Sequence, residues 1–162
     1  MEIVPIAAEY VESFHRALDC VVRERRFLAF LEAPPIESTR AFVLNNIEQG
    51  YPQFVAISAG EVMGWCDVLP KPRPVHAHVG VLGVALLPGF RGQGHGERLM
   101  RQTLDAARAF GMHRVELTVR QHNTNAIALY RKIGFEIEGL MRDAIKVDDV
   151  CENVVLMGLL FE

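Results

Sequence analysis

The fold of this chain is decided by the stretch Leu82-Gly-Val-Ala-Leu-Leu-Pro-Gly-Phe-Arg-Gly-Gln-Gly-His-Gly-Glu-Arg-Leu-Met100. Its apolar beginning is typical of a buried strand, and Pro88-Gly89 ends that strand. Apolar residues then recur at helical spacing from Leu99 until Gly111 stops the pattern. The stretch therefore predicts a strand, a glycine-rich turn and a helix.

The turn between strand and helix has the sequence Arg91-Gly-Gln-Gly-His-Gly96. Its glycines allow a sharp bend and place no Cβ atoms between a ligand and the peptide N–H groups. These N–H groups open a helix, where the helix dipole and the unpaired donors favour an anion. We therefore expect a diphosphate site built from Arg91, Gly92, Gln93, Gly94, His95, Gly96 and Glu97.

Two familiar phosphate loops do not fit this turn. The dinucleotide fingerprint requires Gly-x-Gly-x-x-Gly, and the nucleoside-triphosphate loop ends in Gly-Lys-Ser/Thr, whereas this loop runs Gly96-Glu97-Arg98. The pattern Arg-x-x-Gly-x-Gly, formed by Arg91, Gly94 and Gly96, resembles the coenzyme A loop of the GNAT superfamily of acyl-CoA N-acyltransferases. A dinucleotide- or ATP-binding protein is a distant alternative.

A second motif, Val119-x-x-x-Asn123-x-x-Ala-Ile-Ala-Leu-Tyr130-x-x-x-Gly134-Phe135, is similar to the other long motif of that superfamily. The resemblance implies that Asn123 contacts the pantetheine arm and that Tyr130 faces the thioester sulfur. It also implies that Val84, Ala85 and Leu86 bind the pantetheine through their backbone. Shorter segments resemble the bacterial branch that acetylates small-molecule and peptide amines: Phe27-Leu-Ala-Phe30, Gly64-Trp65, His78-x-Gly-x-Leu-Gly83 and Gly139-Leu-x-Arg142.

Periodicity and turn signals predict alternating strands and helices over one domain, residues 1–162. We expect strands at 2–7, 51–58, 61–69, 76–87, 113–120, 135–147 and 150–161, and helices at 9–30, 38–49, from the glycine-rich turn to 110, and at 124–133. The second helix is expected to bury Phe42, Val43 and Ile47. The resemblance implies an α/β fold with a mixed, largely antiparallel central sheet of about seven strands, flanked by about four helices.

Composition narrows the class of protein. The chain has 162 residues, half of them hydrophobic, and a formal net charge of −3, which argues against a nucleic-acid or membrane partner. Its three cysteines are far apart and odd in number, so we expect no disulfide framework and a cytoplasmic location. His76 and His78 supply at most two ligands of a metal site, and we expect no metal. The resemblance also allows a homodimer.

Acetyl transfer to an amine needs a polarised carbonyl, a neutral amine and a proton for the leaving thiolate. The resemblance implies acetyl-CoA as cosubstrate and a small-molecule or peptide primary amine that attacks the thioester directly, in a ternary complex. It further implies that the Leu86 N–H polarises the thioester carbonyl, as an oxyanion hole does. Tyr130 is the candidate acid that protonates the thiolate.

The general base is the open point. In relatives, a carboxylate or histidine occupies positions that match Thr118, Gly80 or Leu82, and none of these residues accepts a proton here. A water relay is one alternative, and the candidate side chains are His78, Asp67 and Glu32. A non-catalytic acyl-CoA sensor on the same fold is therefore the second hypothesis for function.

Overall fold

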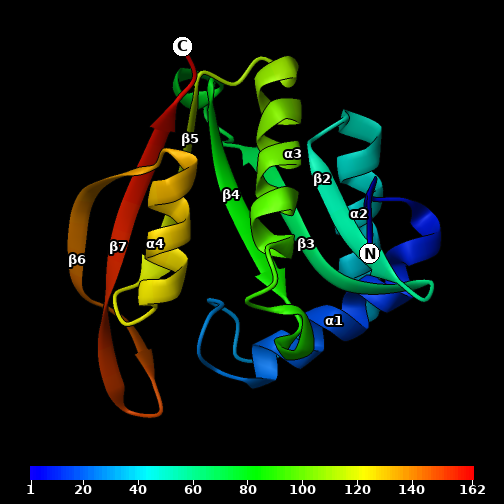
Figure 1. The fold of residues 1–162 in the computed structure, drawn as a ribbon, viewed down its shortest axis with the longest axis horizontal. Coiled ribbons are helices and arrows are strands. Elements are labelled where there is room, and N and C mark those ends of the chain that lie inside the picture. The colour runs from blue at the N-terminus through cyan, green and yellow to red at the C-terminus, as the bar shows by residue number, and fades with distance from the viewer.

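A computed structural model describes residues 1–162 and shows a seven-stranded sheet flanked by four α-helices (Figure 1). The elements are β1 (Glu2–Pro5), α1 (Val11–Arg23), α2 (Ile36–Gln49), β2 (Gln53–Ser58), β3 (Glu61–Pro70), β4 (Val79–Leu86), α3 (His95–Phe110), β5 (Arg114–Arg120), α4 (Thr124–Ile133), β6 (Glu136–Val147) and β7 (Val150–Leu160). The strand order is β1-β2-β3-β4-β5-β7-β6, and only the β4–β5 pair is parallel. The expected mixed, largely antiparallel sheet is confirmed.

The two parallel strands separate along their length. Val79–Val81 of β4 pairs with Arg114–Glu116 of β5, and no pairing joins the two strands beyond Val81. β4 nevertheless stays paired with β3 as far as Leu86. The opening between the diverging ends of β4 and β5, hereafter the split, widens towards the lower edge of Figure 1.

Backbone alternation decides which polar groups of β4 face the split. The Leu87 N–H donates to the Met63 carbonyl at 2.9 Å, so this residue pair is hydrogen-bonded across β3 and β4. Because antiparallel neighbours alternate in direction, the N–H groups of Leu86 and Val84 point the other way. The split therefore has free backbone donors along its β4 side.

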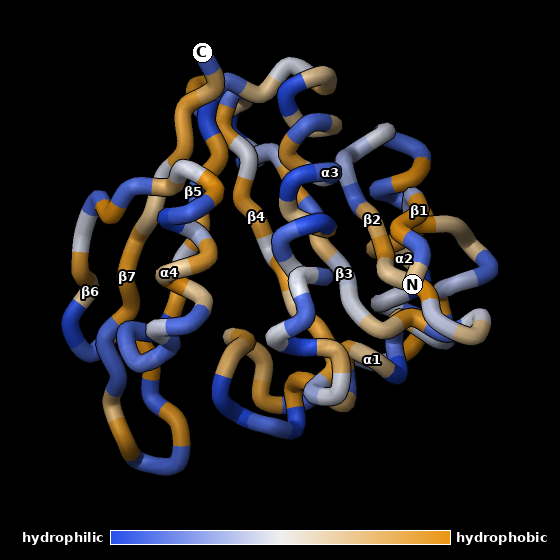
Figure 2. Tube along the Cα trace, viewed as in Figure 1, coloured by the Kyte–Doolittle hydropathy of each residue, from blue (hydrophilic) through white to orange (hydrophobic).

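The helices cover the two faces of the sheet, with α3 and α4 on one face and α1 and α2 on the other (Figure 1). One core cluster packs α3 on residues such as Val115, Leu117 and Val119, the three predicted on one face of their strand. The other cluster packs α1 on β2 and β3. Figure 2 shows the hydrophobic residues concentrated along the central strands. No helix has both the length and the apolar character that crossing a bilayer requires.

The first helix ends seven residues earlier than predicted. It ends at Arg23, where the N–H groups of Glu24 and Arg25 reach back only three residues, at 3.2 and 3.0 Å. Arg25 then adopts a left-handed φ of 57°, which breaks the helical path. The prediction to Phe30 was wrong because contacts from distant residues hold this segment outside the helix, although residues 27–31 are apolar.

Two further details differ from the prediction. Strand β4 begins at Val79 rather than residue 76, since Pro74 starts a 3₁₀ turn that includes His76. Helix α2 buries Thr39, Val43 and Asn46, while Phe42 and Ile47 are exposed.

The expected closing hairpin is confirmed, and both of its turn residues, Asp148 and Asp149, have positive φ.

Candidate active site

The glycine-rich turn folds into a loop whose N–H groups have no partner in the chain. Gly92 and Gly94 take φ values of 71° and 84°, a region that costs side-chain-bearing residues energy. The Gln93 Nε2 donates to the Gly89 carbonyl at 2.9 Å and braces the loop. The N–H of Arg91 is paired with Pro88, and helical bonding resumes with Arg98 to Gly94. Six consecutive N–H groups, residues 92–97, are thus left without a protein acceptor.

These donors fit a diphosphate. They lie at the N-terminus of the sixteen-residue helix α3, where the dipole adds to the attraction for an anion. The Glu97 side chain is neutralised by Lys132 at 2.8 Å and Arg101 at 2.9 Å, and these bonds, Lys132 first, lower the pKa of its carboxyl. Glu97 therefore adds no uncompensated negative charge beside the loop.

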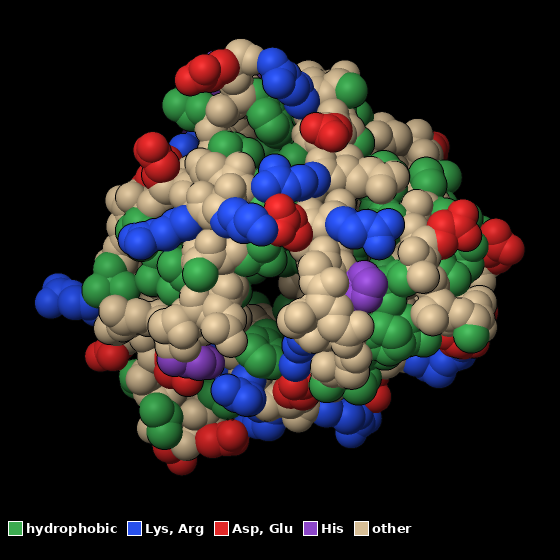
Figure 3. Space-filling view, viewed as in Figure 1, with side chains coloured by type: hydrophobic (Ala, Val, Ile, Leu, Met, Phe, Trp, Pro, Cys, Tyr) green, Lys and Arg blue, Asp and Glu red, His purple; other side chains and the backbone are tan.

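A cavity of about 590 Å³ joins this loop to the split. Figure 3 shows the hollow between α3 and α4, with Lys and Arg side chains gathered above it. Its lining includes most of the cofactor-binding residues predicted from the sequence: Val84, Ala85 and Leu86 of β4, Arg91, Gly92, Gly94, Gly96 and Glu97 of the loop, and Asn123 and Tyr130 of the second motif. The lining does not include the predicted Gln93 and His95. Residues as far apart in sequence as Val84 and Tyr130 thus line the same cavity.

Asn123 and Tyr130 take up the positions that the second motif predicts around the cavity. Asn123 is the N-cap of α4 and accepts the Ala126 N–H at 3.3 Å through Oδ1, which leaves its Nδ2 free. Tyr130 is 9% exposed, and no hydrogen bond holds its hydroxyl within the protein. Burial, and secondly the nearby Cys66, raise the pKa of the phenol. The hydroxyl therefore stays protonated and available as a donor.

Asp67 is a buried carboxyl without a hydrogen-bond donor. It lies on β3 directly opposite Gln53 of β2 and Gly83 of β4. Burial alone raises the pKa of Asp67 to about 7. A Cβ at Gly83 would come within 3.3 Å of the Asp67 Oδ1, so the missing side chain leaves room for the carboxyl. The Gln53 Nε2 beside it is buried and has no acceptor.

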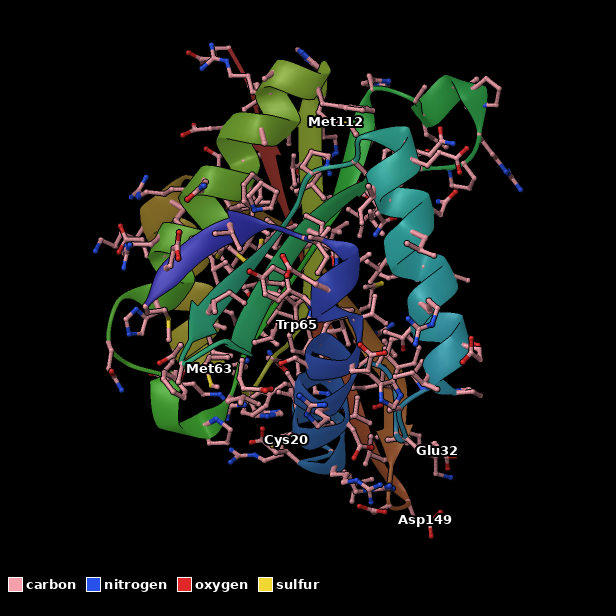
Figure 4. The ribbon with its side chains drawn as sticks, turned by 90° about the vertical axis from the view of Figure 1, so that its right-hand side faces the viewer. Cys20, Glu32, Met63, Trp65, Met112 and Asp149 are labelled. Atoms are coloured by element: carbon pink, nitrogen blue, oxygen red, sulfur yellow. The ribbon has the colours of Figure 1, made fainter.

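Asp67 lies on the face of the sheet that α1 covers. By strand alternation it shares this face with Trp65, whose ring meets Phe14 of α1 edge-on at 5.3 Å. Figure 4 shows Trp65 between α1 and the sheet. Ala85, opposite Trp65, lines the cavity. Asp67 is therefore separated from the split by a single strand, β4.

The other base candidates lie elsewhere. His78 is an exposed turn residue just before β4, at the opposite end of that strand from Leu86, with its ring beside His113. Glu32 is exposed in the segment before α2, and Figure 4 shows it at the periphery, on the same end of the molecule as Asp149. Neither residue lines the cavity.

The matched positions of β4, Gly80 and Leu82, lie in the packed core. Leu82 is buried beneath α3, and a Cβ on Gly80 would meet Val68 and Met112 of the same core. Val81, Gly83 and Ala85 face the α1 side instead. Gly80 and Leu82 therefore contribute packing and no proton acceptor, and their match to catalytic positions of relatives stays a prediction.

Three residues at or next to the cavity were not singled out from the sequence: Glu24, Phe27 and Arg120. Phe27 lines the cavity, Glu24 pairs with Arg91, and Arg120 is 5% exposed beneath the same segment. Glu24 and Arg120 are 67 and 95 positions from the residues that they contact, so no local pattern signals these contacts.

Residues 18–135 match the model of the acetyltransferase (GNAT) family, which is more than half of the chain. The chain belongs to this family. The GNAT motifs recognised from the sequence, at Arg91–Gly96 and Asn123–Tyr130, both lie within the matched region and both line the cavity.

Relatives and solved structures agree with this placement. This GNAT protein is 35% identical over 91 residues to the L-amino acid N-acetyltransferase AaaT of Escherichia coli, covering 56% of each chain. It is 39% identical over 94 residues to the N-alpha-acetyltransferase RimI of Mycobacterium tuberculosis, covering 57% of this chain and 56% of that one. The chain thus matches little more than half the length of these relatives.

The fold is also that of a solved GNAT superfamily phosphinothricin acetyltransferase from Sinorhizobium meliloti in complex with acetyl-CoA. The TM-score is 0.93, at 20% identity, and the match covers 99% of this chain and 88% of that one. At this identity the likeness concerns the fold alone.

Proposed function

We propose that this GNAT protein is an acetyl-CoA-dependent N-acetyltransferase that acts on the α-amino group of an amino acid or of a peptide. The observation that carries the proposal is the row of six unpaired N–H groups, residues 92–97, that opens onto a split strand. This arrangement offers an anion site and an extended backbone edge in one cavity. Coenzyme A has a diphosphate and an amide-bearing arm to match.

The diphosphate binds the N–H groups of the loop, and the pantetheine arm lies in the split. There its amides pair with the free backbone of Val84 and Leu86, as an added strand would. Asn123 donates from Nδ2 to the same arm. The exposed Arg and Lys side chains above the hollow favour the remaining negative charge of the nucleotide (Figure 3).

Leu86 and Tyr130 stabilise charge on the two sides of the bond that breaks. As the amine attacks, negative charge develops on the carbonyl oxygen, and the Leu86 N–H donates to it. The thiolate then leaves against the Tyr130 hydroxyl, which donates a hydrogen bond or its proton. Since burial excludes water around this phenol, the interaction is stronger than it would be in solution.

Asp67 is the general base in this proposal. The α-amino group at a peptide N-terminus has a pKa of about 7.7–8.0, so the proton transfer from it to a carboxyl whose pKa is about 7 is close to thermoneutral. The α-amine of a free amino acid is more basic, so its deprotonation is less favourable. Asp67 reaches over Gly83, where β4 offers no side chain of its own, directly or through one water. None of the three candidates lines the cavity. Asp67 is preferred because it pairs with Gly83 of β4 beside the split, whereas His78 precedes the far end of β4 and Glu32 is exposed before α2.

The acceptor class is supported by the names of the relatives. One is named for L-amino acids and the other for N-alpha acetylation, and both names describe α-amines. A lysine side chain, with a pKa of about 10.4, would need a stronger base than Asp67. We therefore place α-amines before side-chain amines.

We also propose a location and an assembly for the protein. The three cysteines are unpaired and two of them are exposed, which suits the reducing cytoplasm. The edge strand β6 exposes Ile137, Leu140 and Met141, and we propose that this edge pairs two copies in a homodimer. Sedimentation equilibrium of wild-type protein and of Leu140→Lys tests the pairing, which the charge should abolish.

The test of function is an acetyl-CoA assay with a panel of amines, in which released thiol and acetylated product are both measured. We expect release with L-amino acids or peptides that have a free N-terminus, and none with their N-acetylated forms. Tight binding of coenzyme A without product on any amine would instead support the acyl-CoA sensor. The exposed Thr118, where relatives have a carboxylate, is the observation that keeps this second function in view.

A further inference from the structure

Arg91 follows the end of β4, and its guanidinium contacts three other parts of the chain. Its Nη1 and Nη2 donate to the two carboxylate oxygens of Glu24, at 2.8 and 2.5 Å. Its Nε donates to the Leu86 carbonyl at 2.9 Å, and its guanidinium lies 4.6 Å from the centre of the Phe27 ring. A guanidinium held by a bidentate carboxylate, a carbonyl and an aromatic face has little left for a ligand.

Arg120 reaches the same segment from the other side of the split. It is the last residue of β5 and is 5% exposed. Its Nη1 donates to the Arg25 carbonyl at 2.9 Å, and its Nη2 donates to the Leu28 carbonyl at 2.8 Å. Glu152 of β7 lies 3.4 Å from Nη1 and compensates the buried charge.

The strands that carry these arginines are the two that diverge. One arginine follows β4, the other ends β5, and both hold Glu24–Leu28. A third contact ties this segment to the β6–β7 turn, where Arg25 donates to both oxygens of Asp148 at 3.1 and 2.7 Å. The segment thus crosses the open end of the split and brings Phe27 into the cavity.

We propose that Glu24–Leu28 is a strap which Arg91 and Arg120 hold across the split, so that Arg91 is a positioning residue for Phe27 and the acceptor side rather than a ligand of the diphosphate. The proposal rests on the proposed function in one respect, that the split receives the thioester arm. It predicts that breaking the Glu24–Arg91 pair loosens the strap and leaves diphosphate binding intact.

The first experiment measures the strap itself. Hydrogen exchange of the amides of residues 24–31 is followed by mass spectrometry in wild-type protein, Glu24→Gln, Arg91→Gln and the double variant. Loss of a charge-assisted bidentate pair corresponds to about tenfold faster exchange or more. The double variant should exchange no faster than Arg91→Gln, because the Glu24–Arg91 pair is already lost there. Arg91→Gln can exceed Glu24→Gln, since it also loses the contacts with the Leu86 carbonyl and the Phe27 ring. Asp19→Asn, which breaks the exposed Arg23–Asp19 pair one turn earlier, is the matched control and should leave these amides unchanged.

The second experiment tests whether Arg91 binds the diphosphate or positions the strap. Calorimetry compares the affinity of wild-type protein and Arg91→Gln for 3′-phospho-ADP, the half of coenzyme A that contains the diphosphate. We expect a change of less than about threefold, together with a raised KM for the amine in turnover, while loss of a charge-assisted contact to phosphate would cost at least about tenfold. A tenfold loss, or unchanged exchange in Glu24→Gln, overturns the strap. If the wild type fails to bind 3′-phospho-ADP, the proposed function falls, and the exchange data still decide the strap.

Discussion

The two sides of the cavity are built in different ways. The cosubstrate side, formed by the loop at Gly92–Glu97 and the free edge of β4, consists mostly of backbone groups. The proposed acceptor side consists of Phe27, which lines the cavity, and of side chains next to it from distant elements: Asp67 on β3, Glu24 after α1 and Arg120 at the end of β5. If the proposed function holds, binding of coenzyme A depends on backbone shape, whereas catalysis and acceptor choice depend on a few individual side chains.

The largest expected effect belongs to the acceptor side. Asp67→Asn removes the proposed base and should lower kcat/KM for the amine by about 10²–10⁴-fold. In wild-type protein kcat/KM should rise with pH through an apparent pKa near 7, because the carboxyl accepts a proton only when ionised. β2 and β4 place only the uncharged Gln53 and Gly83 opposite it. The α-amine of the acceptor titrates at about 7.7–8.0, and comparison with the profile of Asp67→Asn separates the two ionisations. If Asp67→Asn leaves kcat/KM and its pH dependence unchanged, Asp67 is not the general base and a water relay removes the proton.

Tyr130→Phe tests the side chain that the cosubstrate side contributes to chemistry. It removes the hydroxyl and keeps the ring that packs on Phe135, so the fold should be retained. We expect kcat to fall by roughly 10²-fold while the acetyl-CoA dissociation constant changes by less than about threefold. Stopped-flow thiol release and calorimetry give the two quantities. If turnover is untouched, the acid assignment fails.

Gly94→Ala tests the backbone-built loop. The φ of 84° strains any side chain by about 1–2 kcal/mol, and the Cβ stands where the diphosphate approaches. We expect coenzyme A to bind at least about tenfold more weakly, as measured by calorimetry. Gly50→Ala is the matched control, since Gly50 has a φ of 69°, equally open surroundings and no place in the cavity. Equal losses of affinity in both variants would show that strain, not ligand contact, is responsible.

The smallest effect concerns stability. In the unfolded chain Asp67 titrates near 3.8, and in the folded protein near 7. Between these values the folded protein keeps a proton that the unfolded chain releases, so raising the pH through this window destabilises the fold, and the loss is complete above about pH 7. Asp67→Asn has no such proton. The Tm of Asp67→Asn should therefore rise relative to that of the wild type between pH 4 and pH 8. In calorimetric scans, each kcal/mol of unfolding free energy that the wild type loses corresponds to about 2–4 °C. A constant difference would show that Asp67 titrates normally.

The cosubstrate side could be predicted from the sequence because its signals are local. Three glycines, a strand and a helix lie within nineteen residues, and one motif links Asn123 to Tyr130 within two helical turns. The sheet was equally predictable, since alternation placed Val115, Leu117 and Val119 on one buried face.

The acceptor side could not be predicted in the same way. The apolar run at residues 27–31 is typical of a helix, and the contacts of this segment with Arg91, Arg120 and Asp148, far away in sequence, hold it in another path. The sequence also left open which face of β4 packs in the core, because a shift of one residue would exchange the faces of Gly80 and Leu82 with those of Val81 and Gly83. Long-range side-chain contacts settle both points, and a single sequence does not encode their pairing.

The central claim is that coenzyme A lies in this cavity with its diphosphate on the loop and its sulfur beside Tyr130. A crystal structure of the protein with coenzyme A tests it most directly. The account predicts phosphate oxygens within hydrogen-bond distance of the N–H groups of residues 92–97 and the thiol facing the Tyr130 hydroxyl. A diphosphate bound anywhere else, or a sulfur directed away from that phenol, would contradict it.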